Sequence, residues 1–234
     1  MPDMLPDNYD PSRFERPSVT VDVVIFSLLN DKLHLLLVKR KFSPFAGMWA
    51  IPGGFVYITE SLEGAAGRKL KEETGVNEVY MEQLYTFGDP GRDPRMRVIT
   101  VAYFALIPAD MTEHRPGGET TETAWVPISK LPSLAFDHRE IVDYALVRLR
   151  YKLEYTMVGF RLLPDTFTLS RLQQAYEIIL GEALDKRNFR RKILSADILE
   201  ETGEKKHDGE GRPAKLYRYK DDAIAEVKTR RLFP

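Results

Sequence analysis

Residues 54–76, GFVYITESLEGAAGRKLKEETGV, set glycine and charged residues at fixed intervals along a helical pattern. Five residues separate Gly54 from Glu60, and seven more separate Glu60 from Arg68. Small and aliphatic side chains recur at helical spacing from residue 61 to residue 74, and Gly75 follows them. The pattern therefore predicts a helix over 61–74 that ends at this glycine.

Three charged side chains of this helix are expected to converge. Lys69, Glu72 and Glu73 stand at positions i, i+3 and i+4, which share one helix face. Carboxylates that converge in this way suit hard cations such as Mg²⁺, which bridge phosphate oxygens. The Gly53-Gly54 turn lets the backbone approach a ligand closely, and Arg68 is expected to orient the glutamates by charge-assisted hydrogen bonds.

The spacing resembles the Nudix box: Gly, five residues, Glu, seven residues, Arg-Glu, an apolar residue, any residue, Glu-Glu, any residue, Gly and an apolar residue. The one departure is Lys69, which stands where that pattern has glutamate. The resemblance implies an α/β/α sandwich around a mixed sheet over residues 18–155. It also implies Glu72 and Glu73 as catalytic residues, and Glu60, Glu72 and Glu73 as ligands of Mg²⁺ or Mn²⁺.

Lys69 weakens the expectation of catalysis. A fixed ammonium group at this point should repel a divalent cation, so we expect weakened Mg²⁺ binding and feeble or absent hydrolysis. In the alternative interpretation Lys69 points to solvent and the glutamates still bind metal. Glu119 or Glu122, in the loop before Trp125, could also supply a catalytic base.

Composition bounds the remaining possibilities. The chain has 234 residues, 43% of them hydrophobic, and a formal net charge of −1, which is typical of a soluble protein. It has no cysteine, which excludes disulfides, thiol catalysis and zinc–thiolate sites. No apolar run is long enough for a membrane helix, and residues 1–17 form a polar, proline-rich arm without a signal-peptide core. We therefore expect a cytoplasmic protein without a membrane partner.

Other elements of the first domain follow from local patterns. The sequence predicts a hairpin over 19–29 and 33–39, strands at 79–87, 97–107 and 124–128, a loop over 109–123 and a helix over 138–153. His34 is expected at the surface because it alternates within a strand. His138 is interpreted as a structural residue near a helix start.

Residues 156–234 have a different pattern, which predicts a small α+β domain. Amphipathic helices are expected over 168–181 and 185–199, followed by a loop between two short strands in 204–220. Five of the seven residues 186–192 are basic. If Phe189 and Ile193 face the core, Arg187 and Arg191 point directly away from it.

This order of elements resembles a winged helix-turn-helix and favours DNA binding. The candidate DNA contacts are Lys186, Arg187, Asn188, Arg190, Arg191, Arg212 and Lys215. Residues 204–220 contain a local excess of three positive charges, which would help a flexible tip to grip DNA. The alternative is a solvated, charged helix on a structural tail.

The two halves together resemble the Nudix-related transcriptional regulators. The resemblance is carried by LLLVKRKFSPFAGMWAIPGGFV (35–56), FTLSRLQQAYEIILG (167–181), DKRNFRRKIL (185–194) and GRPAKLY (211–217). That family includes repressors of NAD biosynthesis genes, which sense ADP-ribose or related nucleotides, and sugar-responsive regulators. The resemblance implies a homodimer on a palindromic operator in double-stranded DNA, with no cofactor required for DNA binding.

The resemblance also directs attention to residues that could contact an effector. The candidates are Arg40, Trp49, Gly53, Gly54, Arg68, Arg92, Arg95 and Arg97. Arginines suit phosphates, and Trp49 could stack on a base or belong to the core. Arg92 and Arg95 could instead stabilise the fold or a dimer interface. Three functions stay open: a nucleotide-responsive repressor, a sugar-responsive regulator and an active nucleoside-diphosphate hydrolase.

Overall fold

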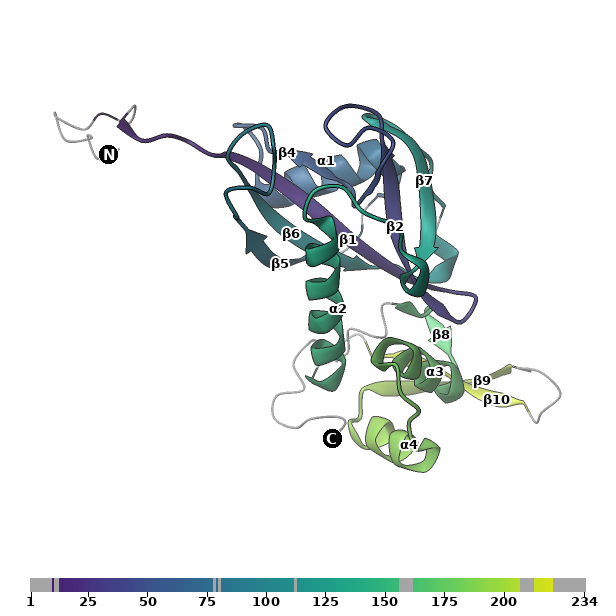
Figure 1. Ribbon diagram of the computed structural model, residues 1–234. Helices are drawn as coiled ribbons and strands as arrows, with labels where there is room; N and C mark the ends of the chain where they lie inside the picture. Colours follow the sequence, from purple (N-terminus) through teal and green to yellow (C-terminus); the bar gives the residue numbers. More distant parts are fainter. Residues whose placement is uncertain are drawn as a thin grey trace.

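The computed structural model describes residues 10, 13–77, 79, 81–111, 113–155, 162–206 and 213–220. The chain forms a sheet domain followed by a smaller domain of two helices and a hairpin, joined by a long helix (Figure 1). Among the described residues, no helix is long and apolar enough to cross a membrane. Most of the amino-terminal arm, residues 1–9, 11 and 12, lies outside the described part.

The first domain contains one mixed sheet of seven strands. Its main path runs β3-β2-β1-β6-β5, with β4 paired to β1 and β7 paired to β2. β6 runs parallel to β1, whereas the other pairs are antiparallel. The strands are β1 (Ser18–Leu29), β2 (Lys32–Arg40), β3 (Trp49–Ala50), β4 (Gly53–Phe55), β5 (Met81–Phe87), β6 (Val98–Leu106) and β7 (Thr120–Pro127).

The predicted hairpin of β1 and β2 is confirmed. Asn30 and Asp31 connect the strands, both with positive φ, the left-handed conformation that asparagine and aspartate tolerate in tight turns. The predicted surface position of His34 is wrong, because its side chain is buried. β2 is flanked by β1 on one side and β7 on the other, and the His34 ring lies 3.0 Å from the Lys32 carbonyl oxygen.

The predicted loop 109–123 is partly wrong. β7 begins at Thr120, so the last part of that segment pairs with the end of β2. Short 3-10 turns, η2 (Ala109–Met111) and η3 (Ile128–Lys130), flank this region. Cross-strand pairing with β2 supplies the hydrogen bonds of residues 120–123. Three of these four residues are threonines, whose preference for strands was a local signal that the prediction missed.

Two helices cover opposite faces of the sheet, which confirms the predicted sandwich. α1 (Leu62–Thr74) packs against the odd-numbered apolar residues of β1, and α2 (His138–Tyr155) packs against the even-numbered ones. α1 begins at Ser61, whose side chain accepts a hydrogen bond from Gly64 N. It ends at Gly75, whose φ of 75° is the left-handed conformation typical of a helix C-terminus.

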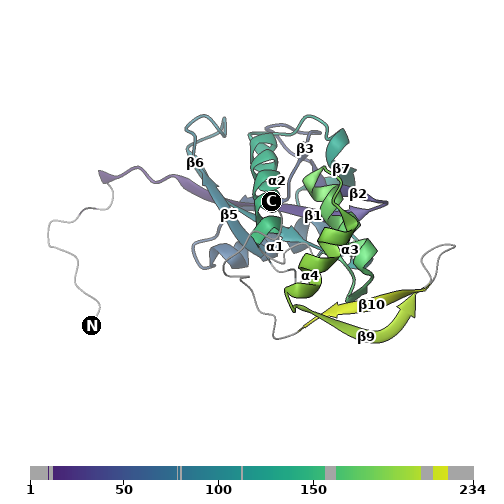
Figure 2. The ribbon, with the colours of Figure 1, turned by 90° about the horizontal axis from the view of Figure 1, so that it is seen from below.

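The second domain contains α3 and α4 beside the hairpin of β9 and β10 (Figure 2), and β8 pairs with β10 to complete a three-stranded sheet. Its elements are β8 (Thr166–Phe167), α3 (Leu169–Leu180), α4 (Lys186–Ser195), β9 (Leu199–Lys206) and β10 (Ala214–Tyr219). α4 is shorter than the predicted helix over 185–199. Its C-cap is Ala196, the next residue has positive φ, and Leu199 already belongs to β9.

The two domains share one apolar core. A single cluster of buried side chains runs from β1 and β2 through α2 to Tyr176 of α3 and Phe189 of α4. Polar contacts add to it: Arg150 Nε donates to the carbonyl oxygen of Ile179 at 3.0 Å. Asp31, in the β1–β2 turn, forms an ion pair with Arg171 of α3. α2 is therefore a packed connection rather than a loose linker.

Candidate functional site

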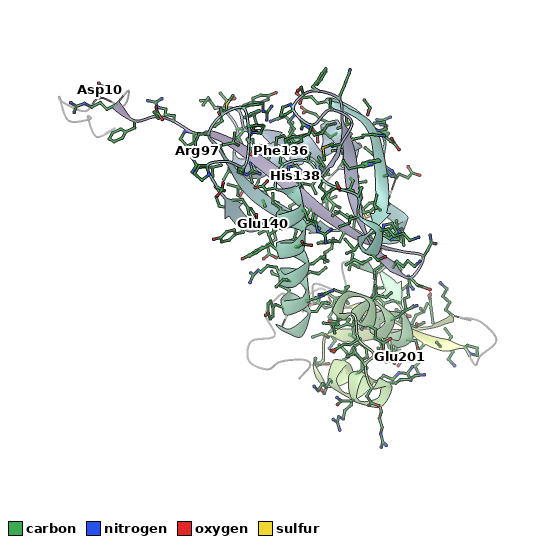
Figure 3. The ribbon with its side chains drawn as sticks, viewed as in Figure 1. Asp10, Arg97, Phe136, His138, Glu140 and Glu201 are labelled. Atoms are coloured by element: carbon green, nitrogen blue, oxygen red, sulfur yellow. The ribbon has the colours of Figure 1, made fainter. Side chains whose placement is uncertain are left out.

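A cavity of about 190 Å³ opens in the first domain, at the ends of β2 and β7 and beside β4. α1 closes one side, and the loop from β5 to β6 and the start of α2 close the other. Figure 3 shows Phe136 and His138 at the end of α2 that adjoins the sheet. The ionisable lining residues are Asp22, Arg40, Lys69, Glu73, Arg92, Asp93, Arg95, Glu119 and His138.

Lys69 reaches this cavity beneath the β4 backbone. A Cβ atom on Gly54 would lie 2.5 Å from Cε of Lys69, so a larger residue at position 54 would displace the lysine. The Lys69 ammonium lies 3.5 Å from Glu72 Oε2 and 4.0 Å from Glu73 Oε1. Its side chain is only 11% exposed, which contradicts the alternative that Lys69 points to solvent.

Glu73 is the most buried carboxylate of the predicted metal site. Its Oε2 accepts a hydrogen bond from the backbone N–H of Gly53 at 3.1 Å. Burial raises the pKa of Glu73 to about 7, although the Gly53 hydrogen bond and the Lys69 ammonium both act in the opposite direction. Near neutral pH this carboxyl group is therefore divided between its charged and neutral forms.

Arg68 orients the neighbouring glutamates, as the sequence predicted. It donates to Glu60 Oε2 at 2.9 Å and to Glu72 Oε2 at 3.2 Å, and its guanidinium lies 4.1 Å from the ring centre of Tyr57. Hydrogen bonding to Arg68 lowers the pKa of Glu60 to about 2. Arg68, Glu60 and Glu72 do not line the cavity, so these contacts hold the outer edge of α1.

The predicted metal ligands do not fit a divalent cation in this arrangement. Glu60 and Glu72 are engaged by Arg68, and the ammonium of Lys69 stands beside Glu72 and Glu73. Within the described residues, no three histidine or acidic side chains lie close enough together to hold a metal ion. A cation arriving here would meet an ammonium where the Nudix pattern has a third carboxylate.

Arg92 connects the β5–β6 loop of the cavity wall to the start of α2. Its guanidinium donates to both carboxylate oxygens of Asp137, at 2.8 and 2.7 Å, and lies 3.5 Å from Asp22. Burial is the largest single influence on Arg92 and lowers its pKa, but the hydrogen bonds to Asp137 and the negative charges of the nearby carboxylates together outweigh it and raise the pKa. Arg92 therefore has the fold-stabilising role considered as an alternative for it, while it also lines the cavity.

Asp22 was not predicted from the sequence. Its Oδ2 accepts a hydrogen bond from Thr100 at 2.7 Å, and its Oδ1 lies 3.6 Å from His138 Nε2. The signal was present, because Asp22 is a lone charge within an apolar strand. His138 Nδ1 accepts from Ile51 N at 3.1 Å, which agrees with its predicted structural role. Complete burial lowers the pKa of His138, so the ring is neutral near pH 7.

Two further arginines lie on the cavity beside aromatic rings. Arg40 lies 4.7 Å from the ring centre of Phe136 and donates to the carbonyl oxygens of Pro44 and Phe42. Burial, with the nearby positive charge of Arg95, lowers the pKa of Arg40. Arg95 is paired with Asp93 at 2.7 Å, and it lies 5.8 Å from the same Phe136 ring.

Several predicted site residues lie away from the cavity. Trp49 packs against the core and bridges to Leu134, so its place matches the core alternative. Arg97 is exposed and donates to the carbonyl oxygens of Asp89 and Val98. Of the two candidate loop bases, Glu119 lines the cavity, whereas Glu122 pairs with Lys39 at 3.2 Å.

The second candidate surface is the outer face of α4. Phe189 and Ile193 are buried, and Arg187 and Arg191 are exposed on the opposite side, as the helical geometry predicted. Within the described part of the chain, no ion pair to a carboxylate forms at Lys186, Arg187, Arg190 or Arg191. Arg190 donates to Ser170 and Arg191 to Asn188, so α4 keeps its positive charge.

The helix-turn-helix geometry is fixed by hydrogen bonds in and around the turn. Gly181 ends α3 with a φ of 80°, and Asp185 caps α4 through the N–H of Asn188 at 2.7 Å. Between them, the Glu177 carboxylate accepts from Leu184 N and from Gln173 Nε2, each at 2.9 Å. These bonds hold the turn at a fixed distance from α3.

The hairpin of β9 and β10 is less basic than predicted. Three of its cations form ion pairs with acidic residues that precede or lie within β9: Lys215 with Glu201, Arg218 with Glu200, and Lys220 with Asp197. The excess of three positive charges over 204–220 stands, but Asp197, Glu200 and Glu201 precede that segment and offset it, so residues 197–220 contain six basic and six acidic side chains. Arg212 lies outside the described residues.

These features define a Nudix sheet domain coupled to a DNA-binding winged helix. Residues 19–145 match the model of the NUDIX domain, and residues 159–219 match that of the NrtR DNA-binding winged helix domain. A relative described as an ADPR-responsive transcriptional repressor, from Acinetobacter baylyi, is 40% identical over 215 residues, which cover 90% of this chain and 85% of the relative. The chain therefore belongs to the NrtR family of Nudix-related transcriptional regulators.

Solved structures agree with this assignment. NrtR of Shewanella oneidensis in complex with a 27mer DNA has a TM-score of 0.76 and 36% identity, covering 90% of this chain and 99% of that one. The NUDIX domain of the same protein, in complex with ADP ribose, has a TM-score of 0.56 and 39% identity. The match covers 61% of this chain and 94% of the Shewanella NUDIX domain.

Proposed function

We propose that this protein is a transcriptional repressor that binds operator DNA through its winged helix and responds to ADP-ribose or a related nucleotide. The observation that carries the proposal is the pairing of two sites in one chain. Lys186, Arg187, Arg190 and Arg191 of α4 form no ion pair with a carboxylate of the described residues, and the sheet domain holds a cavity lined by three arginines, Lys69 and four carboxylates. Relatives described as ADPR-responsive and as bound to DNA or ADP ribose support both halves.

The DNA-binding unit is a homodimer on a palindromic operator. A helix-turn-helix protein contacts one half-site per subunit, so two copies of α4 would lie about one helical turn of DNA apart. The proposed contacts to base edges or phosphates are Arg187, Asn188 and Arg191, with Lys186 and Arg190 as flanking phosphate contacts. The neutral hairpin contributes less than α4 to the affinity.

The effector is a nucleotide rather than a neutral sugar. Arg40 and Lys69 line the cavity without a carboxylate oxygen closer than 3.5 Å among the described residues, and their charges favour phosphate groups. Arg92 and Arg95 also line it, but each is paired with a carboxylate. Phe136 and Phe55 add aromatic surface. Occupancy changes DNA affinity through α2, which joins the cavity wall at Asp137 and His138 to α3 at Arg150.

The rival function is hydrolysis of a nucleoside diphosphate. It is favoured by the Nudix spacing that remains at Gly54, Glu60, Arg68 and Glu73. Lys69 argues against it, because its ammonium lies where a third carboxylate would hold the metal. We infer that Mg²⁺ binding is weak and that turnover is feeble or absent.

DNA binding is tested by fluorescence anisotropy with the DNA upstream of the regulated genes. The double variant Arg187→Ala/Arg191→Ala should weaken binding by about 100-fold or more, since each good base contact is worth roughly 1–3 kcal/mol. Arg139→Ala is the matched control, because it removes an exposed arginine of α2. Equal affinity of the double variant and the control would refute the assignment of α4.

Effector response and catalysis are separated in the same preparation. Added ADP-ribose should change the affinity of the wild-type protein for the operator, whereas pentoses should not. Incubation of ADP-ribose with Mg²⁺ or Mn²⁺ should release little AMP. Rapid metal-dependent AMP release, together with no binding to upstream DNA, would instead establish the hydrolase.

A further inference from the structure

The ammonium group of Lys69 has hydrogen-bonding capacity directed at the cavity. Its nearest carboxylate oxygens lie 3.5 and 4.0 Å away, on Glu72 and Glu73, beyond the usual 2.7–3.2 Å of an N–H···O hydrogen bond. An ammonium group carries three donors. Because the side chain is held beneath Gly54 and lines the cavity wall, these donors are available to a ligand.

The other cations of the cavity differ in how far they are neutralised. Arg92 is paired with Asp137, and Arg95 is paired with Asp93, each at 2.7 Å. Arg40 donates only to carbonyl oxygens within the described residues, and Lys69 has no carboxylate oxygen closer than 3.5 Å. Arg40 and Lys69 are therefore the two lining cations without a close counter-ion.

We infer that Lys69 is a direct ligand of the effector's diphosphate and replaces the divalent metal that a Nudix box with three glutamates would use. Arg40 is the second cation, and together they match the two negative charges of a diphosphate that joins two groups. The Gly54 backbone packs directly against the side chain of Lys69, which only a glycine allows, and so holds the ammonium in the cavity wall. The inference deepens the proposed function and rests on it.

One consequence is that effector binding does not depend on divalent metal. A metal bridging carboxylates and phosphates makes affinity rise with metal concentration, whereas a lysine fixed in the fold supplies its charge permanently. A second consequence is that the effector is retained intact. A cation that binds phosphate oxygens from a fixed position does not lower the pKa of a bound water as a metal does.

Isothermal titration of the wild-type protein with ADP-ribose tests the first consequence. The Kd should be the same within twofold in EDTA and in millimolar Mg²⁺ or Mn²⁺. Binding that is tenfold tighter with metal would overturn the role of Lys69 while leaving ADP-ribose as the effector. No binding under either condition would overturn the proposed effector, and the inference with it.

Variants of α1 test the residue itself. Lys69→Met keeps the aliphatic stem and removes the charge, and it should weaken ADP-ribose binding by about tenfold or more, the usual worth of a hydrogen bond to a charged group. Lys71→Met is the matched control on the same helix, and it should leave the Kd unchanged. Lys69→Glu should bind weakly in EDTA and recover with Mg²⁺, because it completes three carboxylates at i, i+3 and i+4.

Melting temperatures of these variants establish that each is folded before titration. Wild-type affinity in Lys69→Met would overturn the inference. If a variant failed to fold, the metal dependence of the wild-type protein would still decide the question.

Discussion

Glu73→Gln should make the protein more stable in alkaline solution and change little in acid. Glu73 is buried, and burial raises its pKa from 4.5 to about 7. Below pH 4.5 the carboxyl is protonated in both the folded and the unfolded state. Between pH 4.5 and about 7 the unfolded chain releases this proton while the folded chain keeps it, so rising pH favours unfolding. Above about pH 7 the folded chain also releases the proton, and the free energy of unfolding falls no further.

The size of the effect follows from the shift of about 2.5 pKa units. At roughly 1.4 kcal/mol per unit, the folded wild-type protein should lose about 3 kcal/mol of stability across this range. Glutamine is uncharged at every pH, and its amide oxygen can still accept the hydrogen bond from Gly53. The variant should therefore gain roughly 2–3 kcal/mol over the wild type between pH 5 and pH 8.5.

Urea unfolding in EDTA at pH 5 and pH 8.5 measures this difference. Glu72→Gln is the control, because this neighbouring carboxylate is 41% exposed and water stabilises its charge in both states. The free energy of unfolding of Glu72→Gln, measured relative to the wild type, should change by less than 1 kcal/mol between the two pH values, because both proteins keep Glu73. If Glu73→Gln and the wild type differ by the same amount at both pH values, the argument from burial is wrong.

Three further perturbations address the core, the buried ion pairs and the DNA surface. Phe189→Ala should cost about 3–5 kcal/mol of stability in urea unfolding, because it opens a hole between α3 and α4; a cost below 1 kcal/mol would contradict this packing. Arg92→Met should cost about 3–5 kcal/mol, since it leaves Asp137 and Asp22 without their cation, and unchanged stability would refute that view. Lys186→Ala should reduce the slope of log affinity against log salt concentration by about 1 without altering sequence preference, and an unchanged slope would remove Lys186 from the interface.

The features that the sequence predicted correctly are those encoded within one or two turns of chain. The spacing in 61–75 defines α1 and its end, because the capping serine and the glycine act locally. The buried side of α4 followed from the 100° step between residues, which places Phe189 and Ile193 opposite Arg187. The hairpin of β1 and β2 followed from two apolar runs and a short polar turn.

The errors arose where distant segments decide the environment. Residues 120–123 pair with β2, and the same strand β7 also pairs with β2 at His34, so β2 lies inside the sheet rather than at its edge. The charge of the hairpin was overestimated because Glu200 and Glu201 fall outside the counted segment but face it across the ladder. Asp137 follows a loop, and nothing local indicates that it would meet Arg92, 45 residues earlier.

The continuous apolar core between the domains has a mechanical consequence. Because α2 is packed against both domains, no flexible linker can absorb a displacement at the cavity. Such a displacement has to tilt α2 as a rigid helix. An 18-residue helix is about 27 Å long. A tilt of about 5° at the cavity end would therefore swing the far end through roughly 2 Å. In a dimer the two copies of α4 would each move by this distance in opposite directions. The change in their separation would prevent both from binding successive turns of the DNA at once.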